Sequence, residues 1–291
     1  MLYLDPKYIT QKVTEALMED APYGDITTQF TVDSDAAVRG RLWAKADGIL
    51  SGINVAREAF RLCDENIVFT PIKFDGEELK YGDTIATVEG MSSPILIAER
   101  IALNFMQRMS GIATMTKKYV NLVSHTKAKI VDTRKTTPLL RMFEKYAVRC
   151  GGGTNHRTGL SDGILIKDNH IIAAGGITEA VTRAKSQAAH TLKIEVEIKS
   201  LDQLKEALDA KADIIMLDNF SLEDMREAVK KVKGKVLLEA SGGINETTIK
   251  EIAETGVDII SSGALTHSVK ALDISLDLEK KILQGNNLRW V

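Results

Sequence analysis

Cysteine is scarce in this sequence, and its spacing excludes two classes of protein. Only two cysteines, Cys63 and Cys150, occur in 291 residues, and they fit no redox or metal-binding motif. A disulfide scaffold is therefore excluded, and a zinc or iron site is not expected. Both thiols are expected to be reduced and packed in a core.

Long hydrophobic runs are also missing. No apolar run approaches the ~18 residues that a membrane span needs. The N-terminus, MLYLDPKYIT, has no basic segment followed by an apolar one. The sequence therefore predicts a cytoplasmic protein that does not enter a membrane.

Neither sign of charge is in large excess, since 38 basic residues face 40 acidic ones and the net charge is -2. No overall field attracts nucleic acid or an anionic membrane, so neither is an expected partner. Two nucleotide-binding signatures are absent as well: no GxGxxG follows a strand, and no GxxxxGK[ST] occurs. Affinity for an anion must therefore come from local clusters.

The N-terminal part of the chain reads as a small mixed region. Asp5 and Pro6 are typical of a helix start, and residues 24 to 92 carry short β-like runs separated by glycine turns. A second helix is predicted from Ser93 to Met109, with Arg100 on its polar stripe and with Gly111 interrupting the pattern. These features predict a largely antiparallel sheet flanked by helices.

From residue 128 onward, short β-branched segments alternate regularly with helix-like segments. Such alternation indicates right-handed βαβ crossovers and a parallel sheet. Because the last strands are closely spaced along the chain, a complete or incomplete α/β barrel is favoured over a doubly wound sheet.

Polar or glycine residues follow the predicted barrel strands, where barrels carry their active sites. They are Arg134, Lys135, Lys167, Glu197, Asp218, Ser241, Gly242, Gly243, Ser262 and Gly263. Together with His156 and Arg157, the cations of this set suggest a ligand with carboxylates, a phosphate, or both. The alternative is that nearby acidic residues neutralise these cations, namely Asp132, Glu144, Asp162 and Asp168.

The acidic and glycine-rich strand ends suggest the second half of a site. Glu195 and Glu197 share the strand face predicted to point inward, and Glu197 with Asp218 could hold a hydrated Mg²⁺ or a ribose diol. The SGGI and SSGAL segments each open a helix, where backbone N–H groups favour phosphate. These residues predict a phosphorylated, sugar-like ligand with Mg²⁺ beside a carboxylate-rich substrate, without naming the reaction.

Over nearly its whole length the chain resembles the quinolinate phosphoribosyltransferases, also called carboxylating nicotinate-nucleotide pyrophosphorylases. The segments that carry the resemblance are GDITT (24–28), AERIALNFMQRMSGIAT (98–114), DTRKTTP (132–138), EKYAVRCGGGTNHR (144–157), LIKDNH (165–170), EVE (195–197), IIMLDN (214–219), LEASGGI (238–244) and ISSGALTHS (260–268). One departure is Leu139, which stands where the family usually has glycine after TTP.

The resemblance implies a fold and an assembly. Residues 1–110 would form an N-terminal α/β sandwich, with residues 270–291 packed against it. Residues 111–269 would form an incomplete, open α/β barrel that carries the active site. The protein would be a homodimer or a higher oligomer, with Arg100 contributed to the partner's site.

The resemblance also implies residue roles. Quinolinate would be bound by Arg100, Thr133, Arg134, His156, Arg157 and Lys167. The phosphates of phosphoribosyl pyrophosphate would be bound by Lys135, Thr136, Ser241, Gly242, Gly243, Ser262, Gly263, Ala264 and His267. Mg²⁺ would be held by Glu197 and Asp218, directly or through water, and no organic cofactor is implied. The catalytic group would be Arg134, Lys135, Lys167, Glu197 and Asp218.

The implied reaction belongs to NAD biosynthesis: a pentosyltransferase joins quinolinate to 5-phosphoribosyl 1-pyrophosphate, giving nicotinate mononucleotide, pyrophosphate and CO₂. Two alternatives remain open. One is the related phosphoribosyltransferase-like protein of molybdate systems, and the other is a Schiff-base barrel lyase that uses Lys167. A lipoyl-type carrier with Lys45 as attachment site is disfavoured, because it leaves the barrel unexplained.

Overall fold

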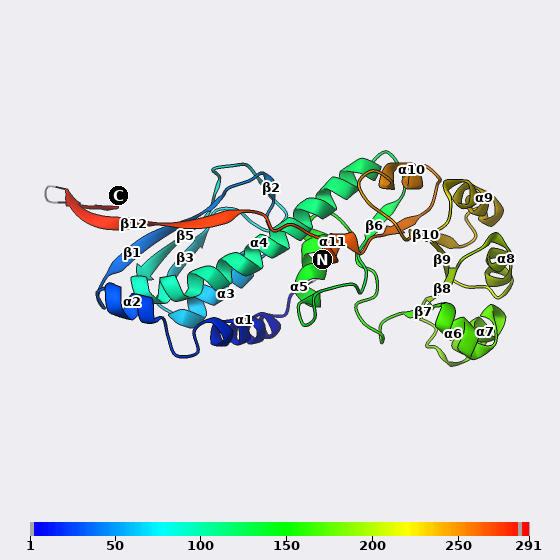
Figure 1. Cartoon of the computed structure of the whole chain (residues 1–291), viewed down its shortest axis with the longest axis horizontal. Coiled ribbons are helices and arrows are strands. Elements are labelled where there is room, and N and C mark those ends of the chain that lie inside the picture. Colours follow the sequence, from blue (N-terminus) through cyan, green and yellow to red (C-terminus); the bar gives the residue numbers. More distant parts are fainter. Residues whose placement is uncertain (1–2, 285–286, 291) are drawn as a thin grey trace. The chain divides into compact units, whose positions relative to one another are not determined.

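A computed structural model describes residues 3–284 and 287–290 of the chain (Figure 1). The chain divides into two compact units. Unit 1 contains Met1–Met115, Met142–Gly152 and Val269–Val291, and unit 2 contains Thr116–Arg141 and Gly153–Ser268.

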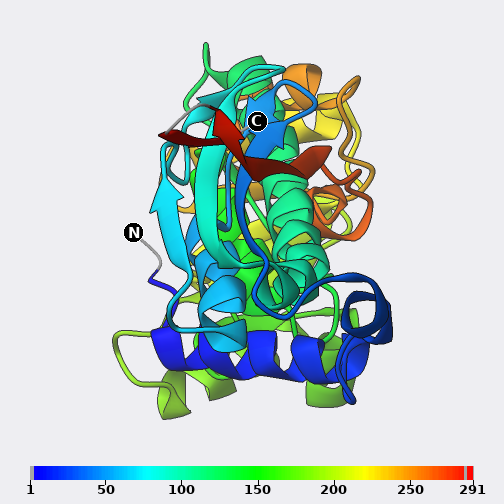
Figure 2. The same ribbon diagram turned by 90° about the vertical axis from the view of Figure 1, so that its left-hand side faces the viewer.

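Unit 1 is built on an antiparallel sheet with the strand order β13-β12-β1-β5-β3. The strands are β1 (Ala37–Ala44), β3 (Val68–Pro71), β5 (Thr84–Met91), β12 (Ile274–Gln284) and β13 (Asn287–Trp290), and a small separate sheet pairs β2 (Gly48–Ile49) with β4 (Glu78–Leu79). Strand β12 comes from the far end of the sequence and pairs with β1. Figure 2 shows this sheet in a view turned by 90° from that of Figure 1.

Unit 1 also contains helices, most of which bury apolar side chains. They are α1 (Pro6–Asp20), α2 (Ile26–Thr31), α3 (Ile53–Cys63), most of α4 (Ser92–Val123) and most of α5 (Arg141–Cys150). The Asp5 side chain caps α1 by accepting from Lys7 N at 2.9 Å, as the predicted helix start requires. Phe60 of α3 is fully buried, and its ring lies 5.7 Å from that of Phe69 on β3.

Helix α4 does not end near residue 109, so the predicted interruption at Gly111 is wrong. The helix continues to Val123. A Cβ at Gly111 would lie 2.3 Å from the carbonyl oxygen of Lys270, so glycine there permits a close backbone approach. Among the described helices, α4 included, none combines the length and apolar character that a membrane crossing requires.

The segment Met142–Gly152 belongs to unit 1, although it lies inside the predicted barrel segment 111–269. The reason is packing: the ring of Phe143 on α5 lies 5.1 Å from that of Tyr8 and 5.2 Å from that of Phe105. Arg108 also pairs with the buried carboxylate of Glu144. The two cysteines lie in unit 1 as free, half-buried thiols, and burial raises the pKa of each to about 11.

Unit 2 is a parallel sheet with the strand order β6-β11-β10-β9-β8-β7. The strands are β6 (Lys129–Val131), β7 (Ile164–Ile166), β8 (Ile194–Ile198), β9 (Ile214–Asp218), β10 (Leu237–Ser241) and β11 (Ile259–Ser261), and the helices are α6 (Asp168–Ala174), α7 (Ile177–Gln187), α8 (Leu201–Asp209), α9 (Leu222–Val232), α10 (Ile249–Ala253) and α11 (Ala264–His267). The consecutive strands β6 and β7 are the two edges of this sheet. The barrel is therefore open between them, and the predicted fold class, an open α/β barrel with an N-terminal α/β sandwich, is confirmed.

Candidate active site

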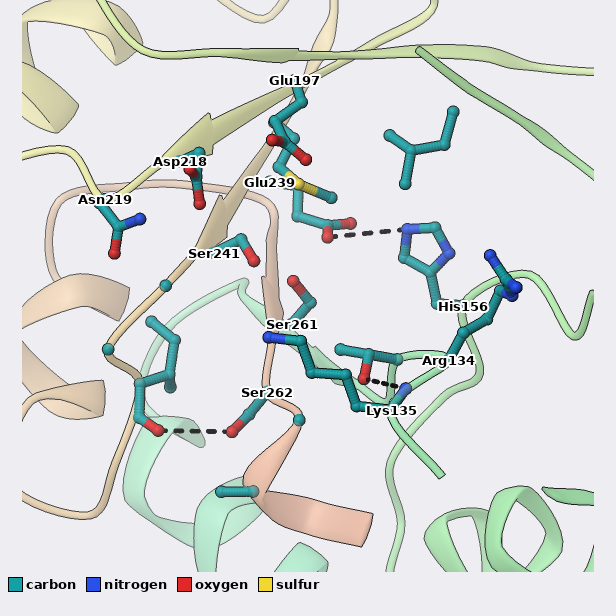
Figure 3. A pocket seen from close by; sticks show the side chains of 18 of the residues that line it. Arg134, Lys135, His156, Glu197, Asp218, Asn219, Glu239, Ser241, Ser261 and Ser262 are labelled. Carbon is teal, nitrogen blue, oxygen red and sulfur yellow. Dashed lines mark hydrogen bonds and ion pairs between the residues drawn. The ribbon is translucent and has the colours of Figure 1, made fainter. Parts of the chain in front are cut away.

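A cavity of about 780 Å³ lies where the parallel strands of unit 2 end (Figure 3). Because all of these strands run in the same direction, their carboxyl ends meet at one rim. The cavity brings together most of the predicted site residues. These are Thr133, Arg134, Lys135, His156, Arg157, Lys167, Glu197, Asp218, Ser241, Gly242, Gly243, Ser262, Gly263, Ala264 and His267.

Two predicted residues do not line this cavity. Thr136 instead accepts a hydrogen bond from Arg141 Nε at 2.9 Å through its hydroxyl oxygen. Arg100 is an exposed residue of α4 in unit 1. Its expected contact with a partner's substrate stays a prediction.

The side chains of Arg134 and Lys135 are exposed and form no ion pair with a carboxylate in the described part of the chain. Hydrogen bonds instead hold the backbone that carries them. Lys135 N donates to the hydroxyl oxygen of Thr133 at 3.0 Å, and the Thr266 hydroxyl donates to the Lys135 carbonyl at 2.7 Å. The segment after β6 thus presents two cations on a fixed backbone.

The acidic residues that could have neutralised these cations are engaged elsewhere. Asp132 accepts from His156 N at 3.0 Å, and Glu144 pairs with Arg108. The carboxylate of Asp162 accepts from Thr158 N at 2.6 Å, while that of Asp168 lies 2.9 Å from Lys199 Nζ. None of these four residues pairs with Arg134 or Lys135 in the described part of the chain, so these two cations are available to an anion. Lys167 and His156, by contrast, each lie beside a carboxylate.

Arg157 adds to the positive charge of the same wall. Its Nη1 donates to the Gly163 carbonyl at 3.0 Å, but its buried Nε has no hydrogen-bond partner in the described residues. Burial, followed by the charge of Arg134, lowers the pKa of Arg157. Cations crowded in this way repel one another, and a bound anion would relieve the repulsion.

A carboxylate pair faces the cations from adjacent strands. Glu197 lies near the end of β8, 2.7 Å from Lys167 Nζ, whereas Asp218 ends β9 and its carboxylate has no hydrogen bond or ion pair among the described residues. Carboxylate oxygens are the ligands that Mg²⁺ prefers. With one carboxylate unengaged and the other shared with a flexible lysine side chain, this donor set fits a hydrated Mg²⁺.

A buried acidic cluster surrounds His156, and of its members only Glu239 was not predicted to point toward the site. His156 Nε2 lies 3.0 Å from a Glu195 carboxylate oxygen and 3.7 Å from one of Glu239, and both carboxyl groups are buried. Burial, followed by the charge of Glu195, raises the pKa of Glu239. Figure 3 shows Glu239 directed toward the His156 ring, and Glu239 lines the cavity.

These three residues lie close enough together to hold a metal ion, but the imidazole is not arranged as a ligand. The backbone N–H of Arg157 donates to His156 Nδ1 at 2.7 Å. Since Nδ1 accepts a hydrogen bond, a neutral ring carries its proton on Nε2, which then donates to Glu195. The cluster is therefore a hydrogen-bonded floor of the cavity.

Among the lining residues that sequence reasoning missed, Glu239 carried a detectable signal. Glu239 has the same strand parity as Ser241, which was placed at the rim, so it should have been expected to point inward. The other missed lining residues are Leu165, Met216, Asn219, Ile244, Asn245 and Ser261. Of these, Asn219, Ile244 and Asn245 lie beyond strand ends, where no periodic pattern marks a direction.

Glycine conformations shape the two loops expected to receive phosphate. Gly242 and Gly243 have φ values of +93° and +63°, which L-residues rarely adopt. A Cβ at Gly263 would lie 2.9 Å from side-chain atoms of both His267 and Lys135. Because glycine has no side chain, the backbone N–H groups of these loops and the side chains of Lys135 and His267 can lie close to one another.

Comparison with known proteins agrees with this arrangement. The chain matches the family described as quinolinate phosphoribosyl transferase, N-terminal domain, over residues 25–110 and its C-terminal domain over residues 112–277. It is 48% identical over 261 residues to a probable nicotinate-nucleotide pyrophosphorylase [carboxylating] of Bacillus subtilis, covering 90% of each chain.

Two further similarities extend over nearly the full length. The chain is 45% identical over 274 residues to the nicotinate-nucleotide pyrophosphorylase [carboxylating] of Mycobacterium leprae, covering 91% of this chain and 95% of the relative. A solved structure of the nicotinate-nucleotide pyrophosphorylase from Francisella tularensis superposes with a TM-score of 0.92 at 46% identity, covering 95% of this chain and 98% of that one. This chain belongs to the quinolinate phosphoribosyltransferase family.

Proposed function

We propose that this chain is a carboxylating nicotinate-nucleotide pyrophosphorylase of NAD biosynthesis. It transfers the phosphoribosyl group of 5-phosphoribosyl 1-pyrophosphate to quinolinate and yields nicotinate mononucleotide, pyrophosphate and CO₂. The observation that carries the proposal is the cavity itself, where Arg134 and Lys135 lack carboxylate partners among the described residues and face the acidic ends of β8 and β9. A dicarboxylate and a phosphorylated sugar together match these charges.

Quinolinate is proposed to bind on the cationic wall. Arg134, Arg157 and Lys167 supply positive charge for its two carboxylates, and Thr133 lies beside them. The predicted contact of His156 with quinolinate is kept in this proposal, because His156 lines the cavity. Its Nε2 also lies 3.0 Å from a Glu195 carboxylate oxygen, which fixes the direction of the ring.

The phosphoribosyl substrate is proposed to lie against the opposite, glycine-rich side. Lys135 and His267, with the loops at Ser241–Gly243 and Ser262–Ala264, would bind its phosphates. Thr136, predicted to join them, is proposed instead to brace the loop through Arg141. Glu197 and Asp218 would hold Mg²⁺, and the bound ion would help to neutralise the charge that develops on the departing pyrophosphate.

The residues of the cavity support a two-stage reaction. The pyridine nitrogen uses its lone pair to form a bond to C1 of the ribose, and the C1–O bond breaks with its electron pair leaving on pyrophosphate. Lys135 and Arg134 stabilise that negative charge. The bond from ring carbon C2 to its carboxylate then breaks, CO₂ departs, and the electron pair left on C2, stabilised by the cationic nitrogen, takes up a proton.

The Schiff-base alternative is not favoured by the environment of Lys167. Its Nζ forms an ion pair of 2.7 Å with Glu197, whereas a lysine that attacks a carbonyl group must present a neutral amine. Borohydride treatment in the presence of carbonyl substrates is expected to leave no adduct on Lys167. A trapped adduct at that residue would support the lyase instead.

Assembly and location also belong to this proposal. We propose a homodimer in which Arg100 reaches the quinolinate site of the partner. The cytoplasmic location expected from the sequence remains a prediction, since relatives of this chain include proteins named chloroplastic and mitochondrial.

The direct test is an assay of the purified chain with Mg²⁺ and phosphoribosyl pyrophosphate, comparing quinolinate with nicotinate as acceptor. Released CO₂ and nicotinate mononucleotide are measured together. Equal amounts of both products from quinolinate are expected. Turnover of nicotinate alone, without CO₂, would overturn the assignment of substrate.

A further inference from the structure

Asn219 occupies an unusual backbone position at the rim of the cavity. It directly follows Asp218 at the end of β9 and has a φ of +54°, in the left-handed region. Its N–H donates to the Ser241 carbonyl at 2.9 Å, which ties the turn to the end of β10. Residues other than glycine adopt this conformation at a cost, although asparagine tolerates it better than most.

The side chain of Asn219 lies directly over the loop Ser241–Gly243. A Cβ built at Gly242 would lie 2.2 Å from Asn219 Oδ1 and 2.6 Å from its Cγ, so any larger residue at 242 would displace the amide. Figure 3 shows the Asn219 amide beside this loop and next to Asp218. The two positions are therefore matched, since the absence of a side chain at 242 makes room for the amide at 219.

The amide of Asn219 has unused hydrogen-bonding capacity. Neither its Oδ1 nor its Nδ2 has a hydrogen bond to another described residue, and Asn219 lines the cavity together with Asp218, Ser241 and Gly243. An amide is neutral and offers both donors and an acceptor. Beside the acidic Asp218 it is a donor that an approaching phosphate can use.

We propose that Asn219 is a positioning residue for the phosphoribosyl substrate, with its amide resting on Gly242 and donating to a phosphate held by the Ser241–Gly243 loop. The inference rests on the proposed function, because that function places the sugar phosphate at this loop. This positioning role differs from a purely structural one, in which asparagine would be present at residue 219 only because it tolerates a left-handed backbone.

Asn219→Gly separates the two roles, because glycine adopts φ +54° without strain and removes the amide together with the one methylene that carries it. We expect the Kd for Mg²⁺-phosphoribosyl pyrophosphate, measured by calorimetry, to rise roughly five- to tenfold, as for loss of one hydrogen bond. The KM for quinolinate should change by less than about twofold on the same reasoning. Asn219→Asp, which keeps the shape but adds negative charge near the phosphate, should weaken binding further.

A matched control is Lys233→Gly. Lys233 also has a left-handed backbone, with φ +50°, and it lies at the end of α9 outside the cavity lining. That variant should bind the phosphoribosyl substrate as the wild type does. If Asn219→Gly also binds as the wild type does, the inference is wrong and the amide serves only the turn. If the wild-type chain itself does not bind phosphoribosyl pyrophosphate, the proposed function fails and the inference fails with it.

Discussion

Among single residues, Leu139 combines a left-handed backbone with an exposed apolar side chain. Its φ is +66° and its relative exposure is 73%. It stands where the family resemblance led us to expect glycine, directly after the TTP segment. The structure gives that departure a physical meaning, since this position requires the conformation that glycine adopts freely.

Leu139→Gly is therefore expected to stabilise the chain by about 0.5–1 kcal/mol, because relief of the left-handed strain exceeds the added flexibility of glycine in the unfolded state. Little buried surface is lost at this exposed site. Urea denaturation measures the difference. Leu139→Ala, which keeps the strain, is the control, and an equal gain in that variant would contradict the explanation.

Glu239 gives a prediction about pH. Burial, followed by the charge of Glu195, raises its pKa from 4.5 to about 8. Between these values the folded chain holds a proton that the unfolded chain has lost, so this group's contribution to stability is full below pH 4.5 and is lost as pH rises toward 8. Glu239→Gln removes this dependence because its amide never ionises.

As pH rises from about 5 to about 8, the free energy of unfolding of Glu239→Gln is expected to increase by on the order of 2 kcal/mol relative to that of the wild type. The melting temperatures of the two proteins, measured across this pH range, should therefore diverge. The exposed Glu251→Gln is the control and should follow the wild type throughout. Parallel curves for Glu239→Gln and wild type would show that Glu239 is ionised in the folded chain.

How far single residues could be predicted depended on charge and position. Arg134, Lys167 and Asp218 were found because a charge directly after a buried strand is conspicuous. Glu239 was missed although its strand parity matches that of Ser241, because it lies between apolar neighbours and because the groups that raise its pKa are distant in sequence. Asn219 carries no charge, and its meaning depends on the contact with Gly242.

At the scale of elements, the length of α4 shows how tertiary contact overrides local propensity. Glycine weakens a helix interior, so a break near residue 111 was a reasonable expectation. The helix continues because the chain at Lys270 packs against the bare backbone of Gly111. The strand rhythm of unit 2, by contrast, follows from local patterns that packing reinforces.

Gly111→Ala should consequently destabilise unit 1, although alanine is the better helix former. The new Cβ would lie 2.3 Å from a backbone carbonyl oxygen, which cannot move as a flexible side chain could. A net loss of about 1–3 kcal/mol is expected in thermal or urea unfolding. Gly159→Ala, whose Cβ would meet nothing nearer than 3.7 Å, should be nearly neutral. If the Gly111→Ala variant proved as stable as the wild type, the packing argument would be contradicted.

For the whole molecule, the expected homodimer can be tested by complementation. Arg100→Ala and Arg134→Ala are each expected to lower quinolinate turnover by about a hundredfold or more, because each removes a cation from the substrate. In the proposed shared site, a hybrid dimer contains one site that lacks both arginines and one that is intact. Mixed and fully exchanged subunits should then regain up to about a quarter of wild-type activity, because half of the dimers are hybrids.

The control is a mixture made without subunit exchange, which should remain inactive. No recovery after complete exchange, shown by mass-labelled subunits, would place Arg100 outside the partner's site. Sequence patterns alone could not predict this level of organisation, because contacts between subunits leave no periodic signal in one chain. The expectation came from the family resemblance.

The pairing of β1 with β12 has a consequence for synthesis of the chain. The indole N–H of Trp43 donates to Asp277 at 2.7 Å across a separation of 234 residues, within the same pair of strands. During translation, the strand that completes the first sheet leaves the ribosome only after the whole parallel barrel has emerged. Until then, one edge of β1 has no strand paired with it and can associate wrongly with another chain. Vectorial synthesis therefore favours a nascent chain whose barrel folds before its N-terminal sheet is finished.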